Sequence, residues 1–182
     1  LAGPPVPGAG IVATADAVRA AWDRLAAGVQ GDVDAGPCVL VGVMVGGAIP
    51  LVRVAERLRG DFRLDYCHAT RYGGATAGGG VRHVQRTHLP LDGCTAVLVD
   101  DIFDEGHTLA AIRADCLAAG AARVRIAVLA RKRHDRALAG LEPDHVGLEV
   151  PDEYVFGCGM DYRERWRHLD AIWALPAGAP PA

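Results

Sequence analysis

The sequence lacks a long apolar run, a signal-peptide pattern and any Cys-x-x-Cys pair. Because a transmembrane helix needs about 20 apolar residues, we expect no membrane segment, and we expect a cytoplasmic location. The five cysteines are an odd number, which favours reduced thiols over a disulfide framework or a structural zinc site.

A strong positive charge is also missing. The formal net charge is −3 and there is no long basic run, which argues against general nucleic-acid binding. With 182 residues, 51% hydrophobic and 23% charged, the chain is long and apolar enough for a globular core. We predict a single domain over residues 1–182, with loose termini at 1–10 and 176–182.

The most informative stretch runs from Val97 to Thr108 and reads VLVDDIFDEGHT. Its first three residues are apolar and indicate a buried strand of a parallel sheet. Two carboxylates, a short loop with a glycine, and a predicted helix starting near Thr108 follow. This order predicts a ligand at the carboxyl end of the sheet, where open α/β folds bind their substrates.

The loop has the chemistry of a phosphate site. Gly106 allows close approach of the backbone, and amides from Glu105 to Leu109 would point outward at a helix N-terminus. The hydroxyl of Thr108 adds a donor, whereas the neighbouring carboxylates could accept hydrogen bonds from sugar hydroxyls or move a proton. Together these groups predict a sugar phosphate as the ligand.

The remaining pattern predicts alternating helices and strands. Thr14 would cap a helix that ends near Ala27, with Gly28 as its stop. Five glycines between residues 73 and 80 indicate either a surface hairpin or a mobile lid. The other predicted elements are strands at 39–45, 62–72, 81–89, 123–129, 146–150 and 171–175, and helices at 48–59 and 108–119.

The acidic pair, two apolar residues and Asp-x-Gly-x-Thr resemble the phosphoribosyl pyrophosphate (PRPP) motif of type I phosphoribosyltransferases. Further segments resemble the bacterial hypoxanthine-guanine phosphoribosyltransferases, in order, over residues 39–167. These segments are Gly46-Gly47 after a strand, 68–74, Lys132, 149–157 and 161–162. The resemblance implies an α/β fold, type I phosphoribosyltransferase-like, with a central mostly parallel sheet flanked by helices, a small hood and a flexible flap.

The resemblance also implies roles for individual residues. Asp104 would be the catalytic acid or base at the purine N7, and Asp100 and Asp101 would bind the ribose hydroxyls. Lys132 would donate to the purine 6-oxo group, Tyr154 would stack on the base, and Val155 would contact it through the backbone. The 5′-phosphate would be bound by Glu105, Gly106, His107 and Thr108.

The same resemblance implies Mg²⁺ as cofactor, with Asp161 as its ligand. Pyrophosphate would be bound by Arg167 and by the backbone of Val45 and Gly46, and the flap residues Arg71 and Tyr72 would close over the reacting centre.

Three departures from the family pattern stand out. His107 replaces a Lys or Arg of many relatives, and Val45 replaces a lysine of some. There is one extra residue before Pro143, so the alignment with the family is uncertain by about one position. It therefore leaves open which of residues 131–133 stands where the family has its purine-reading lysine.

The implied reaction is purine salvage, in which hypoxanthine or guanine and PRPP give IMP or GMP and pyrophosphate. One alternative is a xanthine-preferring relative, and another is a PRPP-sensing regulator that binds nucleic acid. The expected partners are small molecules only, PRPP and a purine base, with no nucleic acid and no membrane. Relatives form dimers or tetramers, so a homo-oligomer is implied.

Overall fold

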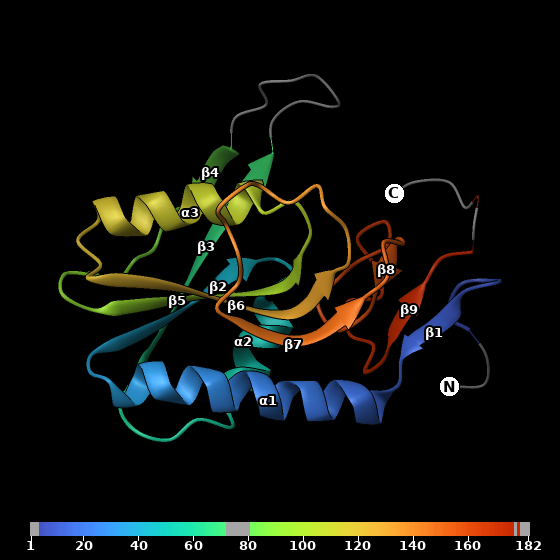
Figure 1. Cartoon of the computed structure of the whole chain (residues 1–182), viewed down its shortest axis with the longest axis horizontal. Coiled ribbons are helices and arrows are strands. Elements are labelled where there is room, and N and C mark those ends of the chain that lie inside the picture. The colour runs from blue at the N-terminus through green and yellow to red at the C-terminus, as the bar shows by residue number, and fades with distance from the viewer. Residues whose placement is uncertain (1–3, 72–80, 177, 179–182) are drawn as a thin grey trace.

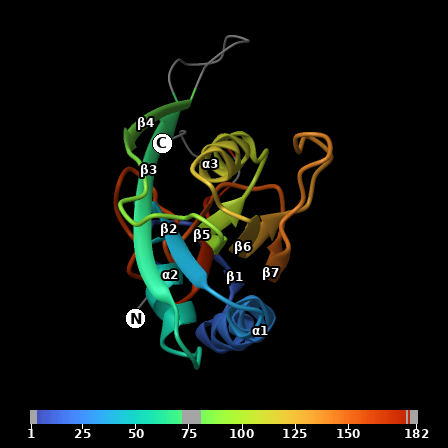
Figure 2. The same ribbon diagram turned by 90° about the vertical axis from the view of Figure 1, so that its left-hand side faces the viewer.

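The structure is a computed structural model that describes residues 4–71, 81–176 and 178. Its centre is a twisted sheet with helices on both faces (Figures 1 and 2). Five neighbouring strands are parallel and the edge strand β4 is antiparallel, which confirms the predicted fold class. In spatial order the strands are β4 (Val81–Gln85), β3 (Arg63–Arg71), β2 (Cys38–Met44), β5 (Thr95–Phe103), β6 (Arg123–Lys132) and β7 (His145–Val150).

The strand order changes direction between β2 and β5. From β2 the chain continues to β3 on one side, whereas β5, β6 and β7 follow on the other side. The pairing of β2 with β5 ends at Gly42 and Val99, so the two strands separate where Asp100 begins. Such a switch point opens a crevice at the carboxyl ends of the strands, which is where α/β sheets bind ligands.

Side-chain alternation along the apolar strands fills a core on each face of the sheet. Val97 and Val99 pack with helix α1 (Ala15–Asp34) and helix α2 (Ala48–Ala55) on one face. Leu98 packs on the opposite face, with helix α3 (His107–Ala118). The apolar run of β5 is therefore continuous because both of its faces are buried.

The first helix is longer than the sequence predicted. Thr14 does cap it, accepting from the amide of Ala17 at 3.3 Å, but the helix passes through Gly28 and ends at Asp34. A Cβ on Gly28 would lie 2.7 Å from Nδ1 of His145 in β7. The glycine therefore serves close packing against the sheet and is not a helix stop.

Two other predicted elements end early. Helix α2 ends at Ala55. Beyond it, the amides of Arg57 and Leu58 donate to the carbonyls three residues earlier and no longer to those four residues earlier, as they would in an α-helix. Strand β4 stops at Gln85, because the amides of His88 and Leu89 donate to the buried carboxylate of Asp65 at 2.7 and 2.8 Å.

A second, smaller sheet forms the hood at the end of the molecule that carries both termini (Figure 1). It pairs β1 (Gly10–Ala13) with β9 (Ile172–Ala174) and β9 with β8 (Val155–Phe156), all antiparallel. The prediction of a loose arm over residues 1–10 is therefore wrong at its end, since Gly10 is in β1 and Ala9 is buried beside Trp173.

Neither a membrane-spanning helix nor a disulfide occurs among the described residues. None of the helices within the described ranges is both long and apolar enough to span a bilayer. All five cysteines are buried and unpaired.

Candidate active site

A cavity of about 260 Å³ opens at the carboxyl ends of β2 and β5, at the switch point of the sheet. Its lining brings together the acidic strand end, the glycine loop and the start of α3 with the loop after β2 and one residue of the hood. The predicted site residues that line it are Gly46, Asp100, Asp101, Asp104, Glu105, Gly106, His107, Thr108 and Arg167.

Asp100 and Asp101 both reach this cavity although neighbouring residues of a strand point to opposite faces. The carboxylate of Asp100 folds back and accepts from the backbone amide of Asp101 at 2.9 Å. The carboxylate of Asp101 lies against the loop after β2, where a Cβ on Gly46 would be 2.2 Å from its Oδ2. Glycine at position 46 is thus the residue that lets the loop backbone approach this acid.

Burial raises the pKa of Asp100 well above its usual range, and the neighbouring Asp101 raises it further. Burial also raises the pKa of Asp101, although less, because its contact with Asp100 and the charge of Arg167 act in the opposite direction. The pair is therefore a desolvated acidic site whose oxygens suit hydrogen bonds to neutral groups such as hydroxyls.

The loop after β5 ends in an uncapped helix N-terminus. Gly106 precedes α3 with a φ of 84°, a left-handed conformation that glycine adopts without strain. No side chain caps the helix, and its first amides belong to His107 and Thr108. An N-terminus of this kind favours a phosphate, because its unpaired amides and the helix dipole both attract negative charge.

Asp104 is the first residue of this loop after β5, and two donors contact its carboxylate. Lys132 Nζ donates to its Oδ2 at 2.9 Å, and His134 Nε2 lies 2.6 Å from its Oδ1. Partial burial acts to raise the pKa of Asp104, but the hydrogen bonds and charges of Lys132 and His134 outweigh it and hold the pKa below its usual value. Asp104 is thus an ionised carboxylate at neutral pH.

The predicted strand 123–129 is too short, and this matters for the site. Strand β6 continues to Lys132 because β7 pairs with it as far as Val150. The side chain of Arg131 instead pairs with Glu142 at 3.0 Å, so Lys132 is the residue of the 131–133 cluster that reaches Asp104.

Arg167 connects the hood to the acidic pair. Its Nη2 lies 2.7 Å from Oδ1 of Asp161, and its Nη1 donates to the carbonyl of Gly159 at 2.7 Å and lies 4.0 Å from Oδ2 of Asp101. Asp161 also accepts from the amide of Glu164 at 2.8 Å. The arginine is thus held between two carboxylates at the edge of the cavity.

Several predicted site residues lie outside this cavity. Val45, which follows a cis peptide bond after Met44, is 53% exposed and faces a neighbouring pocket with Trp166. In the hood, Tyr154 donates to the carbonyl of Asp161 at 3.1 Å, and Val155 is buried in β8.

The predicted flap is described only in part. The backbone of Arg71 ends β3, whereas Tyr72 and the glycine-rich run 73–80 lie outside the described residues, so both readings of that run stay predictions.

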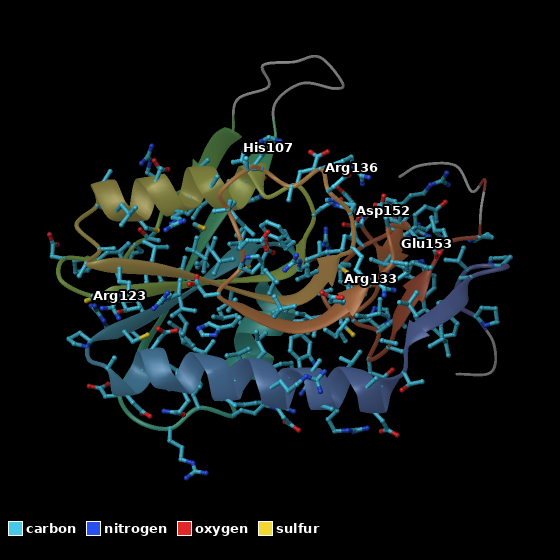
Figure 3. The ribbon with its side chains drawn as sticks, in the orientation of Figure 1. His107, Arg123, Arg133, Arg136, Asp152 and Glu153 are labelled. Atoms are coloured by element: carbon cyan, nitrogen blue, oxygen red, sulfur yellow. The ribbon has the colours of Figure 1, made fainter. Side chains whose placement is uncertain are left out.

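His134 is the functional candidate that the sequence reasoning missed. It belongs to a basic cluster that reads as a solvated turn, yet its side chain is only 4% exposed. Figure 3 shows Arg136 and Asp152 of the same region near each other, far from Arg123 at the start of β6. The sequence offered one hint for His134, its position two residues after Lys132. The contact with Asp104 could not be predicted, because it joins residues 30 positions apart.

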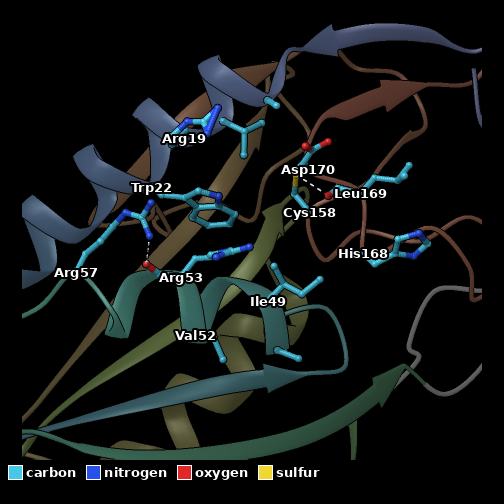
Figure 4. Close-up of a pocket in the computed structure, with 13 residues that line it drawn as sticks. Arg19, Trp22, Ile49, Val52, Arg53, Arg57, Cys158, His168, Leu169 and Asp170 are labelled. Carbon is cyan, nitrogen blue, oxygen red and sulfur yellow. Dashed lines mark hydrogen bonds between the residues drawn. The ribbon is translucent and has the colours of Figure 1, made fainter. Parts of the chain in front are cut away.

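A larger cavity of about 540 Å³ lies between α1, α2 and the hood (Figure 4). Two of its cations are already paired, Arg57 with Asp23 at 2.8 Å and with Glu56 at 2.6 Å, and Arg53 with Glu56 at 3.3 Å. Its Cys158 thiol is buried, which raises its pKa to about 12, so it is protonated and unreactive. The larger cavity is therefore not the better candidate site. The smaller one is, because acids, a cation and a helix N-terminus line it together.

Comparisons with known proteins agree with this geometry. Residues 10–163 match the phosphoribosyl transferase domain family. The chain belongs to that family. A hypoxanthine-guanine phosphoribosyltransferase of Streptococcus pneumoniae is 29% identical over 91% of this chain and 92% of that protein. Another from Staphylococcus epidermidis is 30% identical over 78% of this chain and 79% of that protein.

Solved structures give the same result. A hypoxanthine phosphoribosyltransferase from Staphylococcus aureus superposes with a TM-score of 0.85 at 27% identity, covering 92% of this chain and 91% of that one. The resemblance seen in the sequence is thus confirmed, and this phosphoribosyltransferase is a transferase with the sheet, hood and helices of its family.

Proposed function

We propose that the protein transfers the 5-phosphoribosyl group of PRPP to N9 of hypoxanthine or guanine, giving IMP or GMP and pyrophosphate. The observation that carries this proposal is the placement of the uncapped start of α3, the desolvated pair Asp100 and Asp101, and Asp104 around one cavity. A phosphate, two hydroxyls and a protonated ring nitrogen are the groups that those three features suit.

On this proposal, the 5′-phosphate of PRPP binds to the backbone amides of Glu105, Gly106, His107 and Thr108. The hydroxyl of Thr108 donates a further hydrogen bond to it. The ribose hydroxyls donate to Asp100 and Asp101. Arg167 and the backbone of Val45 and Gly46 bind pyrophosphate and stabilise its charge as it leaves.

The purine would lie over Asp104, which accepts the N7 proton. Lys132 would donate to the 6-oxo group, so an adenine amino group at that place would face a buried ammonium, which is costly. Tyr154 would stack on the ring and Val155 would contact its edge. Flap residues Arg71 and Tyr72 would exclude water from the cationic sugar.

Mg²⁺ is the proposed cofactor. No cluster of three or more His, Cys, Asp or Glu residues suited to a metal ion occurs within the described ranges. This fits Mg²⁺, which commonly binds through one or two carboxylates together with substrate phosphates and water. Asp161, beside Arg167 at the edge of the cavity, is the carboxylate that would bind it, and the ion would neutralise the leaving pyrophosphate.

A substrate panel tests the proposal. Hypoxanthine, guanine, xanthine and adenine are each incubated with PRPP and Mg²⁺, and release of pyrophosphate is followed. We expect turnover with hypoxanthine or guanine and little with adenine. Preference for xanthine supports the alternative of a xanthine-specific enzyme, and turnover with none of the four bases contradicts the proposal and favours a PRPP-sensing regulator.

Three further expectations belong to this proposal. Residues 1–182 form one catalytic domain, supported by the family match over residues 10–163. The protein acts in the cytoplasm, supported by five buried unpaired thiols. It forms a dimer or tetramer, which light scattering tests directly.

A further inference from the structure

Both oxygens of Asp104 are occupied by donors that differ in one respect. Lys132 sits on a flexible stem at the end of β6, whereas His134 is a rigid ring whose side chain is 4% exposed. The ring is fixed from its other side as well, because the amide of Arg136 donates to its Nδ1 at 3.1 Å.

This second contact determines where the ring hydrogen is. Since Nδ1 accepts from a backbone amide, it carries no hydrogen, so the hydrogen of the neutral ring is on Nε2. His134 therefore donates from Nε2 to Oδ1 of Asp104 at 2.6 Å. The carboxylate is thus held by a donor whose orientation the backbone fixes.

We infer that His134 is a positioning residue for Asp104, and that its hydrogen bond to Oδ1 keeps Oδ2 directed at the purine N7 after Lys132 moves to the 6-oxo group. The inference rests on the proposed function. In the chemical step, N9 forms its bond to C1′ while the bond from C1′ to the pyrophosphate oxygen breaks, and pyrophosphate leaves with the electron pair. The N7 proton passes to Oδ2 of Asp104.

Without His134, the departure of Lys132 would leave Asp104 with neither donor. The carboxyl would then bind a proton more readily and turn more freely, and both effects reduce the fraction of enzyme ready to accept the N7 proton. Two other charged groups act on these residues, Arg136 on Asp104 and Asp152 on His134. Arg136 and Asp152 form an ion pair at 2.7 Å, so their opposite charges largely offset each other.

Two substitutions separate the two contacts of the ring. In His134→Asn, the side chain ends near the place of Nδ1, so it keeps the contact with the Arg136 amide but cannot reach Asp104. In His134→Gln, the terminal amide nitrogen extends to the place of Nε2 and restores a donor to Oδ1. A matched control exists in His145, whose Nε2 lies 2.7 Å from Oδ2 of Asp32 at a position remote from the cavity.

The measurement is kcat/KM for hypoxanthine as a function of pH, with PRPP saturating. For H134N we expect a loss of roughly 10- to 100-fold, the range for a lost hydrogen bond to a charged group. The acidic limb should also move to higher pH, since loss of a donor raises the pKa of Asp104, while the KM for PRPP stays unchanged. H134Q should recover most of the rate and return the limb toward its wild-type position.

The control His145→Asn should lower Tm while leaving the acidic limb in place, because it removes a comparable pair far from the chemistry. Equal profiles for H134N and H145N, or an H134Q variant no better than H134N, would overturn the inference while the proposed function stands. If wild-type protein turns over no purine, the proposed function fails instead. The ¹⁵N spectrum of the His134 ring then tests the geometry alone, with Nε2–H expected and Nδ1–H contradicting it.

Discussion

Three acids within five residues, Asp100, Asp101 and Asp104, have opposite electrostatic surroundings. The first two lie in β5, where burial raises the pKa of both and a cation, Arg167, is 4.0 Å from Asp101. Asp104 lies in the loop that follows, where Lys132 and His134 hold its pKa low. The three residues are of one type, so their pKa values differ because of how deeply each carboxyl is buried and how many donors it contacts.

The difference suits the two parts of the proposed substrate. A desolvated acidic pair with few donors of its own has unused acceptor capacity, which sugar hydroxyls can satisfy. An ionised carboxylate with Lys132 on one oxygen can instead exchange that donor for a ring N–H. On the proposed function, the same short segment would bind a sugar at one end and accept a proton at the other.

The largest expected effect comes from removing the charge of Asp104. Asp104→Asn should lower kcat by about 10²- to 10⁴-fold, the usual range for a lost general base, while IMP still binds. Steady-state kinetics and calorimetric titration with IMP measure the two quantities. Asp23→Asn is the matched control, because this exposed acid pairs with Arg57 at 2.8 Å and does not line the cavity. Full turnover by D104N would show that the proton role is misassigned.

A smaller effect is expected from Arg167, the cation between Asp101 and Asp161. Arg167→Gln should raise the KM for PRPP by roughly tenfold or more, since a charged hydrogen-bond donor to pyrophosphate is lost. The KM for hypoxanthine should change much less, because Arg167 contacts Asp161 and the Gly159 carbonyl and not the pair Lys132 and Asp104. Equal changes in both KM values would contradict this division.

The smallest effect concerns stability, and its sign differs between the two regions. Asp100 has a folded pKa above its ordinary value of 3.8, so its stabilising contribution is present at low pH and lost as pH rises through the folded pKa. Asp104 has a lowered folded pKa, so its contribution is present above the ordinary value and lost as pH falls.

Substitution should therefore shift Tm in opposite directions at pH 8. Asp100→Asn resembles the protonated acid and should therefore raise Tm, at about 2 to 4 °C for each kcal/mol of unfolding free energy gained in a chain of this size. D104N should lower it, since Lys132 and His134 lose their charged partner. Scanning calorimetry across pH compares the two variants, and a Tm change of the same sign in both would break the comparison.

Much of this arrangement could be predicted because it is local in sequence. The apolar run before Asp100, the glycine at 106 and the helix after it lie within one short stretch, and the structure has all three. Helix and strand ends were less predictable where distant residues determine them. Gly28 is inside a helix because His145 packs on it, and β4 ends early because Asp65 takes the next amides.

The contacts of Asp104, which the sequence did not predict, also depend on distant residues. Lys132 reaches Asp104 only because β6 continues beyond Leu129 along β7. In the sequence, His134 is one polar residue of a predicted turn. Its proposed role in positioning Asp104 rests on a contact between residues 30 positions apart and on a backbone amide that fixes its ring. Local patterns predicted the glycine loop and the helix after it, and tertiary contacts determine the donors to Asp104.

The most direct measurement is a crystal structure of the protein with IMP. We predict the phosphate on the amides between Glu105 and Thr108, the ribose hydroxyls on Asp100 and Asp101, and the purine N7 beside Asp104. A phosphate bound elsewhere, with the start of α3 free of ligand, would contradict the account.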